Sequence, residues 1–265
     1  MHPILFDVNG FEIHSYGFMG ALGFLFTAFT ALQRGKALNV KPERMADLMF
    51  FTALLALAGA RLVFILQNPG VFSTWGEWVN LRTGGLVFYG AILVGVPVGS
   101  LLIWRYGMPF FATWDIFGAA FPVAHGLSRI GCFLAGCCYG AHTTGPTAVI
   151  FTDPRSVAPL NTPVHPTQLY EAFFLFALGI GVNLLYYRKA FDGQVMLVYL
   201  LCYALGRSII ESFRGDESRG YFLPDLLGEL LTYSQGFSIV MAAIAVVVFG
   251  VVARRVSATR TPASE

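Results

Sequence analysis

The stretch MADLMFFTALLALAGARLVFILQ (45–67) decides the fold class, because it is long and almost entirely apolar. A helix needs about 20 predominantly apolar residues to cross the hydrocarbon core of a bilayer. The rest of the chain has the same character, since 56% of its 265 residues are hydrophobic and only 12% are charged. A soluble domain carries roughly 25% charged residues. We therefore predict a membrane protein.

Further segments resemble this one in length and composition. The predicted spans are 16–33, 45–67, 86–104, 113–135, 168–187, 194–213 and 235–253. No internal repeat or linker divides the chain. We therefore expect an all-α integral membrane protein with seven transmembrane helices, folded as a single polytopic membrane domain over residues 1–265. The N-terminal segment lacks the basic region of a signal peptide, so we expect it to be retained.

Basic residues in the loops predict the orientation, because cytoplasmic loops carry the excess of lysine and arginine. Seven spans place one large group on the same side: Arg34, Lys36, Lys41, Arg44, Arg105, Arg188, Lys189, Arg254, Arg255 and Arg260. The opposite loops hold only Arg82, Arg155, Arg214 and Arg219. We therefore expect the N-terminus outside and the C-terminus in the cytoplasm. The outward loops then lie near 68–85, 136–167 and 214–234. A net charge of +2 predicts no nucleic-acid partner.

Arginines within or near the ends of predicted spans are candidate functional residues, because burying one costs at least roughly 2.5–3.5 kcal/mol on insertion scales. Arg61 is either such a residue or one that is neutralised internally. In VYLLCYALGRSIIESFRGD (198–216), Tyr199, Tyr203, Arg207 and Glu211 recur every fourth residue and share a helix face. Arg207 and Glu211 either neutralise each other, or Glu211 holds Arg207 toward an anionic group.

A second arginine lies in AHGLSRIGCFLAGCCYG (124–140), where His125 and Arg129 are four residues apart. Guanidinium groups bind phosphate through paired hydrogen bonds. Two such groups near a lipid interface suit a phospholipid phosphate, and a water-filled ion pathway is the alternative. The adjacent cysteines of this stretch favour packing residues or a disulfide from Cys132 to Cys137 or Cys138. Because adjacent cysteines seldom chelate one ion well, we predict no metal site.

The stretch NTPVHPTQLYEA (161–172) precedes and begins the fifth predicted span. Thr167 is a candidate N-cap, so the stretch can be an ordinary helix start. Alternatively, polar side chains of this stretch line the outward mouth of a cavity. These are His165, Gln168, Tyr170 and Glu171.

Taken in order along the chain, several motifs resemble the bacterial prolipoprotein diacylglyceryl transferase family. They are IHSYGFMGALGF, GARLVF, GGLVFYG, SRIGCFLAGCCYG, HPTQLYEA, YALGRSIIESFRGD and SQGFSIVM. The resemblance implies transfer of the diacylglyceryl group of phosphatidylglycerol to the lipobox cysteine of a prolipoprotein signal peptide, with glycerol phosphate released. It implies no cofactor. It also implies a site among membrane lipids, on the periplasmic or exterior face of the bacterial cytoplasmic (inner) membrane. We expect a monomer. The alternative is an inactive relative that binds or transports phospholipid.

The resemblance also assigns residue roles. Arg129 and Arg207 match the arginines that handle the lipid phosphate, and Tyr203 and Glu211 match residues that orient Arg207. The chain departs from the family at Tyr89, which replaces a histidine, and at Ser128, Cys132, Ala135 and Cys137 in the signature motif. We hypothesise that His125 replaces the missing base. The candidate catalytic residues are Arg129, Arg207, His125 and Tyr89. The candidate substrate-binding residues are Tyr16, Arg129, Gly140, His165, Gln168, Tyr203, Arg207 and Glu211.

Overall fold

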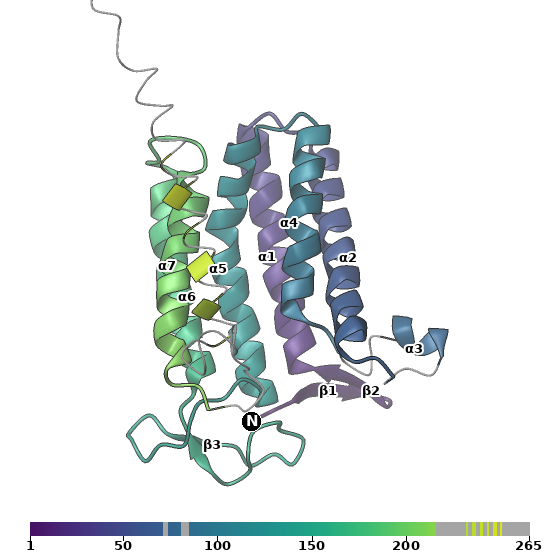
Figure 1. The fold of residues 1–265 in the computed structure, drawn as a ribbon, viewed down its shortest axis with the longest axis vertical. Coiled ribbons are helices and arrows are strands. Elements are labelled where there is room, and N and C mark those ends of the chain that lie inside the picture. Colours follow the sequence, from purple (N-terminus) through teal and green to yellow (C-terminus); the bar gives the residue numbers. More distant parts are fainter. Residues whose placement is uncertain are drawn as a thin grey trace, which may run out of the picture. The chain divides into compact units, whose positions relative to one another are not determined.

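The computed structural model describes residues 1–70, 74–80 and 85–215, together with scattered positions between 232 and 250. Most described residues are helical (Figure 1). The helices are α1 (Ser15–Ala37), α2 (Pro42–Gln67), α3 (Trp75–Val79), α4 (Phe88–Arg105), α5 (Phe110–Ala135), α6 (Thr167–Tyr186) and α7 (Gln194–Glu211). The strands are β1 (Ile4–Val8), β2 (Phe11–His14), β3 (Val149–Ile150) and β4 (Pro163–Val164).

Six of these helices are long and apolar enough to cross a membrane, namely all of them except α3. They match six of the predicted spans to within a few residues, which confirms those predictions. The seventh predicted span, 235–253, lies largely outside the described residues. Most of the predicted outward loop 214–234 also lies outside them.

The strands are a departure from the all-α prediction. β1 pairs with β2, and β3 with β4, in two separate antiparallel sheets. The β1–β2 turn consists of Asn9 and Gly10, whose φ values are 53° and 83°. An Asn-Gly pair with positive φ is the preferred two-residue hairpin turn, because its twist matches that of the flanking strands. The Asn9-Gly10 pair is visible in the sequence, but counting apolar segments does not detect a short hairpin.

The described contacts divide the chain into two compact units. One comprises residues 1–30 and 114–265, and the other comprises residues 31–113. Within the second unit, α2 and α4 pack at glycines. A Cβ added at Gly59 would lie 2.7 Å from the Gly90 carbonyl oxygen and 2.5 Å from Val94 Cγ2. Small residues allow membrane helices to approach this closely and to gain van der Waals contact.

Arg61 of α2 is buried in the second unit, and its guanidinium is satisfied by backbone carbonyls. Nε donates to Trp78 at 2.9 Å, Nη1 to Gly85 at 3.0 Å and Nη2 to Glu77 at 2.7 Å. Nη2 also donates to Asn80 at 3.1 Å. A buried cation that is fully hydrogen-bonded within the fold is a structural anchor. The structure thus favours the alternative in which Arg61 is neutralised within the fold.

Within the first unit, α5 packs against α6 and α7, and also against the N-terminal part of α1. A Cβ at Gly126 would lie 2.9 Å from the Phe176 ring of α6, and one at Gly118 would lie 2.7 Å from Met196 Cα of α7. A Cβ at Gly23 of α1 would lie 2.8 Å from the Ala124 carbonyl oxygen. These glycines bring the helix carrying His125 and Arg129 close to its neighbours.

Asp115 of α5 holds the start of α7. Its Oδ1 accepts hydrogen bonds from the backbone N–H groups of Val195 and Met196, and its Oδ2 accepts one from Gly193. Lys189 Nζ lies 2.8 Å from Asp115 Oδ2. The first N–H groups of a helix have no partner within the helix. The fully buried Asp115 carboxylate supplies that partner from another helix.

Candidate active site

Glu171 of α6 is the centre of a buried polar cluster in the first unit. Its Oε2 lies 3.2 Å from Arg129 Nε of α5 and 3.1 Å from Arg207 Nη1 of α7. Its Oε1 lies 3.8 Å from His125 Nε2. Arg207 Nη2 also lies 2.7 Å from Glu211 Oε2. One carboxylate therefore joins the two arginines that the sequence placed on separate spans.

The side chains that form these ion pairs are largely buried. Glu171 and Glu211 are 2% and 1% exposed, and Arg207 is 6% exposed. The Arg129 side chain is 15% exposed, so it is more accessible than that of Arg207, which is 8% exposed. A buried charge is tolerated only when it is paired and hydrogen-bonded. The sequence left open whether Arg207 pairs only with Glu211, and the structure shows that it pairs with two carboxylates.

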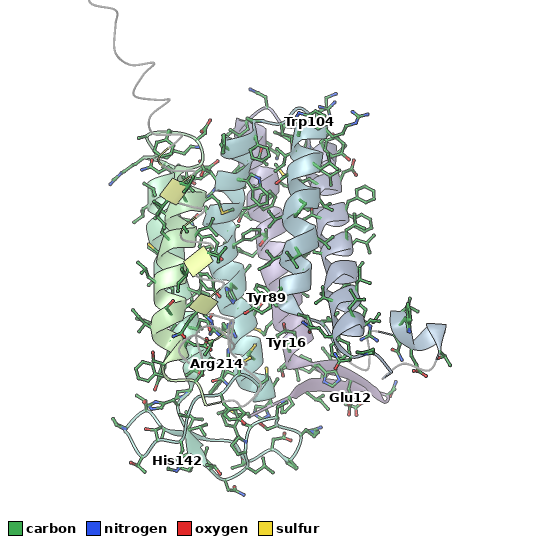
Figure 2. The ribbon with its side chains drawn as sticks, in the orientation of Figure 1. Glu12, Tyr16, Tyr89, Trp104, His142 and Arg214 are labelled. Atoms are coloured by element: carbon green, nitrogen blue, oxygen red, sulfur yellow. The ribbon has the colours of Figure 1, made fainter. Side chains whose placement is uncertain are left out.

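The ion-paired charges at the centre of the cluster balance one another. Arg129 and Arg207 are balanced by Glu171 and Glu211. Arg214, which follows α7 and forms a β-bridge with Gly140, also acts electrostatically on Glu171 (Figure 2). Among the described residues, the ion pairs of the cluster therefore join two arginines to two glutamates.

Aromatic rings pack beside the ion pairs. The His125 ring centroid lies 5.3 Å from that of Tyr203, which lies 6.0 Å from that of Tyr199. Arg129 Nε lies 3.3 Å from His125 Nε2 and donates a hydrogen bond to it. Because this bond occupies the Nε2 lone pair, His125 in this arrangement is neutral, with its proton on Nδ1. The predicted face of α7 therefore meets His125 and Arg129 of α5.

The start of α6 holds the turn that follows α5. Helix α6 begins at Thr167 and its N-cap is Pro166, so the prediction of Thr167 as N-cap is wrong. The Thr167 hydroxyl instead donates to the Cys138 carbonyl at 2.9 Å, and Gln168 Nε2 donates to the Cys137 carbonyl at 2.7 Å. Thr167 therefore links α6 to the turn after α5, and no described side chain caps the start of α6 by a hydrogen bond. The buried Gln168 Oε1 accepts no hydrogen bond from the described residues.

His165 and Gly140 lie where three segments meet. His165 Nδ1 is 3.1 Å from the Tyr170 hydroxyl, and its ring packs against Phe213. The Gly140 N–H donates to the His165 carbonyl at 2.8 Å. A Cβ on Gly140 would lie 2.7 Å from the carbonyl oxygens of both His165 and Phe213. Glycine is therefore required here by close packing of the backbone.

The two remaining candidates fall in different units. Tyr16, on the first turn of α1, is 53% exposed and lies beside α5, where a Cβ on Gly131 would be 3.1 Å from Tyr16 Cα. Tyr89 lies at the start of α4 in the second unit and contacts Phe88 edge to face. The described cluster around Glu171 is therefore built from α5, α6 and α7 of one unit.

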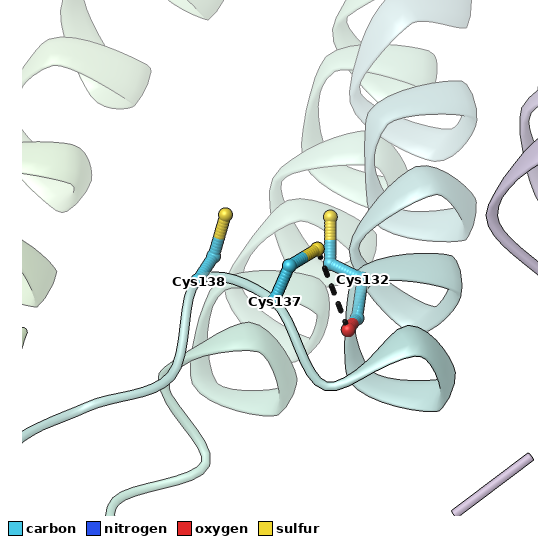
Figure 3. Close-up of side chains that lie close together, drawn as sticks. All are labelled: Cys132, Cys137 and Cys138. Carbon is cyan, nitrogen blue, oxygen red and sulfur yellow. Dashed lines mark hydrogen bonds between the residues drawn. The ribbon is translucent and has the colours of Figure 1, made fainter. Parts of the chain in front are cut away.

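The cysteines gather at the end of α5 (Figure 3). The sulfurs of Cys132, Cys137 and Cys138 all lie within 4.8 Å of one another, and none is in a disulfide. The neighbouring Cys132 and Cys137 thiols lower the pKa of the Cys138 thiol, and the guanidinium groups of Arg129 and Arg214 lower it further. The neighbouring Cys132 and Cys138 thiols, together with burial, raise the pKa of the Cys137 thiol. The three thiols therefore interact closely with one another at this end of α5.

Glu171 is the member of the cluster that the sequence analysis undervalued. It was placed at the mouth of a cavity, whereas its carboxylate is buried and pairs with both arginines. A signal was available, because a carboxylate within an apolar helix is as costly as an arginine. Applying the same rule to QLYEA (168–172) as to the arginines would have selected it.

The family model for prolipoprotein diacylglyceryl transferase matches residues 3–251. Relatives named phosphatidylglycerol–prolipoprotein diacylglyceryl transferase cover most of the chain. The protein of that name from Clostridium tetani is 33% identical over 95% of this chain and 98% of its own length. The form numbered 2 from Clostridium perfringens is 32% identical over 82% of this chain and 84% of its own length. The protein of that name from Thermotoga maritima is 30% identical over 80% of this chain and 74% of its own length.

The family match covers nearly the whole chain, including every helix of the cluster. The six apolar helices and this match together indicate a multi-pass membrane protein. The chain belongs to the prolipoprotein diacylglyceryl transferase family.

Proposed function

We propose that this protein is a phosphatidylglycerol–prolipoprotein diacylglyceryl transferase. It moves the diacylglyceryl group of phosphatidylglycerol to the lipobox cysteine thiol of a prolipoprotein and releases glycerol phosphate. The observation that carries this proposal is the pair of arginines joined by Glu171 Oε2, at 3.2 Å from Arg129 and 3.1 Å from Arg207. The family match supports it across residues 3–251.

In the proposed reaction, the thiol sulfur attacks the diacylglycerol carbon that bears the phosphate. A carbon–sulfur bond forms, the carbon–oxygen bond to the phosphate breaks, and the bonding electrons leave with the phosphate oxygen. Negative charge therefore builds on the phosphate in the transition state. Arg129 and Arg207 are the cations that stabilise this charge, and Arg207 is already positioned for it by two carboxylates.

Arg129 is the arginine that meets the phosphate first, because its side chain is the more exposed of the two. Arg207 pairs with two carboxylates, and it is the more deeply buried positive charge of the site. Three buried oxygens accept no hydrogen bond from the described residues, namely Gln168 Oε1, Glu171 Oε1 and Glu211 Oε1. Such acceptors suit the hydroxyl groups of the glycerol headgroup.

The thiol proton requires an acceptor, because a free thiol has a pKa near 8.5 and is mostly protonated at neutral pH. His125 is the proposed base. Its Nε2 accepts a hydrogen bond from Arg129 Nε, so it becomes available only when Arg129 turns toward the phosphate. Lipid binding and activation of the base are then linked through one side chain.

Tyr203, Tyr16, His165 and Gly140 complete the proposed substrate site. Tyr203 packs on His125 and keeps its ring in place. The exposed Tyr16 contacts the lipid chains or the signal peptide. His165 and Gly140 shape the loop above the cluster. Tyr89 is proposed to occupy the position of the family histidine.

The proposed topology has seven transmembrane helices in a monomer, with the N-terminus outside and the C-terminus in the cytoplasm. The site faces the periplasm or exterior from the bacterial inner membrane. Supporting this orientation, the loop from Gly136 to Pro166 carries few basic residues, and it is hydrogen-bonded to Thr167 and Gln168 at the start of α6. Thiol-reactive labels that do not cross membranes test it on single cysteines placed in each loop.

The experiment that tests the activity incubates the purified protein with phosphatidylglycerol and a lipobox peptide. Mass spectrometry should detect a diacylglyceryl thioether on the peptide cysteine. Wild-type protein should give the product, and the Arg129→Ala variant should not. Folded wild-type protein that binds phosphatidylglycerol but gives no product would instead support the alternative, a lipid-binding or lipid-transporting relative.

A further inference from the structure

Three cysteine sulfurs lie together at the outward end of α5 in an arrangement that the lipid-transfer chemistry does not use. Cys132 is on the last turns of α5, and Cys137 and Cys138 are in the turn that follows (Figure 3). All three sulfurs lie within 4.8 Å of one another. Among the described residues, this is the one group of three side chains placed to ligate a metal ion.

We propose that Cys132, Cys137 and Cys138 bind one thiophilic d¹⁰ metal ion, such as Zn²⁺ or Cd²⁺, through three thiolates. On binding, three metal–sulfur bonds form and the three thiols release their protons. The proposal goes beyond the lipid transferase activity and does not depend on it. It replaces the expectation of no metal site, which rested on the adjacency of two cysteines.

The backbone explains how a C-x4-C-C run brings the sulfurs together. The Cys137 N–H donates to the Cys132 carbonyl at 3.1 Å, and the Gly136 N–H donates to the Phe133 carbonyl at 3.2 Å. Gly136 has a φ of +77°. These are the two hydrogen bonds and the left-handed glycine of a Schellman motif, in which the residue after the glycine folds back over the helix. That residue is Cys137, and the one it folds onto is Cys132.

Cys138 is brought in by a second left-handed residue, since its own φ is +61°. Non-glycine residues seldom adopt this conformation unless the surroundings impose it. Here α6 imposes it, because Thr167 donates to the Cys138 carbonyl and Gln168 to the Cys137 carbonyl. Both side chains are buried, so the turn is held rigid from outside. A ligand set fixed in advance loses little entropy on binding an ion.

The distances favour a metal ion over a disulfide. Zn–S bonds of about 2.3 Å place the sulfurs of three thiolates about 4 Å apart in trigonal or tetrahedral geometry. A disulfide needs sulfurs about 2.05 Å apart, joins only two cysteines and leaves the third outside. Sulfurs that lie mutually within 4.8 Å need only small side-chain adjustments to bind a shared ion. Four residues lie between Cys132 and Cys137, which falls within the spacing of zinc ligand pairs.

The ion has a route to the site. Cys132 is buried, whereas Cys137 and Cys138 are partly exposed. The loop side of the group is therefore open to incoming ions. His125 does not belong to the group, so the protein supplies three ligands and leaves any further position to water or an anion.

The test uses purified full-length protein in detergent, reduced and freed of metal by a chelator. Titration with Cd²⁺ should produce the ultraviolet sulfur-to-cadmium charge-transfer band and saturate at one ion per chain. X-ray absorption of the Zn²⁺ form should give three sulfur ligands at about 2.3 Å. The apparent Tm should rise with free metal concentration, because the ion binds the folded state.

Matched variants separate this site from adventitious binding. Cys202→Ser removes the remaining cysteine, which lies on α7 outside the group, and should leave the titration unchanged. Cys137→Ser and Cys138→Ser, made separately, should each weaken Cd²⁺ binding at least tenfold. Size-exclusion profiles of the metal-free variants should match that of the wild type, which keeps loss of folding distinct from loss of binding.

Two results would overturn the proposal. One is a reduced wild-type protein, with all four thiols counted, that shows no charge-transfer band at saturating Cd²⁺. The other is a bound ion with two or fewer sulfur ligands. Neither result bears on the lipid transferase activity, which is measured separately with the lipobox peptide.

Discussion

Arg207 of α7 and Glu171 of α6 form a buried ion pair, with Nη1 3.1 Å from Oε2. The same carboxylate oxygen receives Arg129 of α5 at 3.2 Å. Two like charges that would repel each other are thereby held on either side of one anion. The Glu171 carboxylate thereby positions both guanidinium groups.

Replacing Glu171 by Gln should lower both the stability and the activity of the protein, because Glu171 pairs with both arginines. Breaking a buried pair by removing one partner costs about 3–5 kcal/mol. We expect a lower Tm, and a KM for phosphatidylglycerol that rises together with a fall in kcat. Glu171→Asp should recover part of both. Glu12→Gln on the exposed β1–β2 hairpin is the control, and full activity of Glu171→Gln would contradict the role of the bridge.

Replacing Arg129 or Arg207 by Lys should reduce kcat/KM by about 10²–10³-fold, the usual loss when one stabilising donor is removed from a transition state. Lysine keeps the charge but lacks the forked donors that bind phosphate through two bonds. Product formation on the lipobox peptide is the measurement. Arg155→Lys is the matched control, because Arg155 is an exposed loop residue that pairs only with Asp153 in the described contacts.

His125→Ala should lower kcat by about 10²-fold or more if His125 accepts the thiol proton, since general bases contribute roughly 10²–10⁴-fold. The acidic limb of the kcat–pH profile should disappear in the variant. His125→Gln should not restore the rate, although glutamine can still accept a hydrogen bond from Arg129. If His125→Ala is fully active while Arg129→Ala is inactive, the base lies elsewhere.

Asp115→Ala should destabilise the protein without altering the lipid site. Loss of a capping acceptor costs about 0.5–2 kcal/mol, and the Lys189 ammonium also loses its buried partner. A fall in Tm, followed by intrinsic fluorescence in detergent, is the readout. Asp115→Asn should lose less, since its side-chain oxygen can still accept N–H hydrogen bonds. Asp192→Ala is the milder comparison, because Asp192 is exposed and pairs only with Lys189 among the described residues.

The Lys189 pair should also make stability depend on alkaline pH. Burial lowers the pKa of the Lys189 ammonium, but hydrogen bonds to Asp115 and Asp192 outweigh it and raise the pKa above its usual value. The pair therefore stabilises the fold fully below the unfolded pKa of about 10.4 and is lost as pH rises through the higher folded pKa. Tm measured from pH 9 upward should fall less steeply in Lys189→Met than in the wild type. If Tm falls equally steeply with pH in both proteins, the Lys189 pair does not cause the alkaline loss of stability.

Much of the fold could be read from the sequence, because spans in a bilayer are governed by length and hydropathy. Six predicted spans correspond to helices in the structure. The arginines at 129 and 207 could be found for the same reason, since charge inside an apolar helix is costly. The β1–β2 hairpin could have been found from Asn9-Gly10, and Glu171 from its place in an apolar helix. Periodicity could not show that the Thr167 hydroxyl donates a hydrogen bond to the Cys138 carbonyl.

The sequence by itself determined the class of the protein, the positions of six apolar helices and the residue types available for an anion site. These are properties of single segments, and each is governed by transfer of that segment between water and lipid. The tertiary structure decided which charges meet. Glu171 joins Arg129 to Arg207, Asp115 caps a distant helix, and side chains of α6 hold the carbonyls of Cys137 and Cys138. Each of these depends on atoms within about 4 Å across different elements, where electrostatic and hydrogen-bond energies become large.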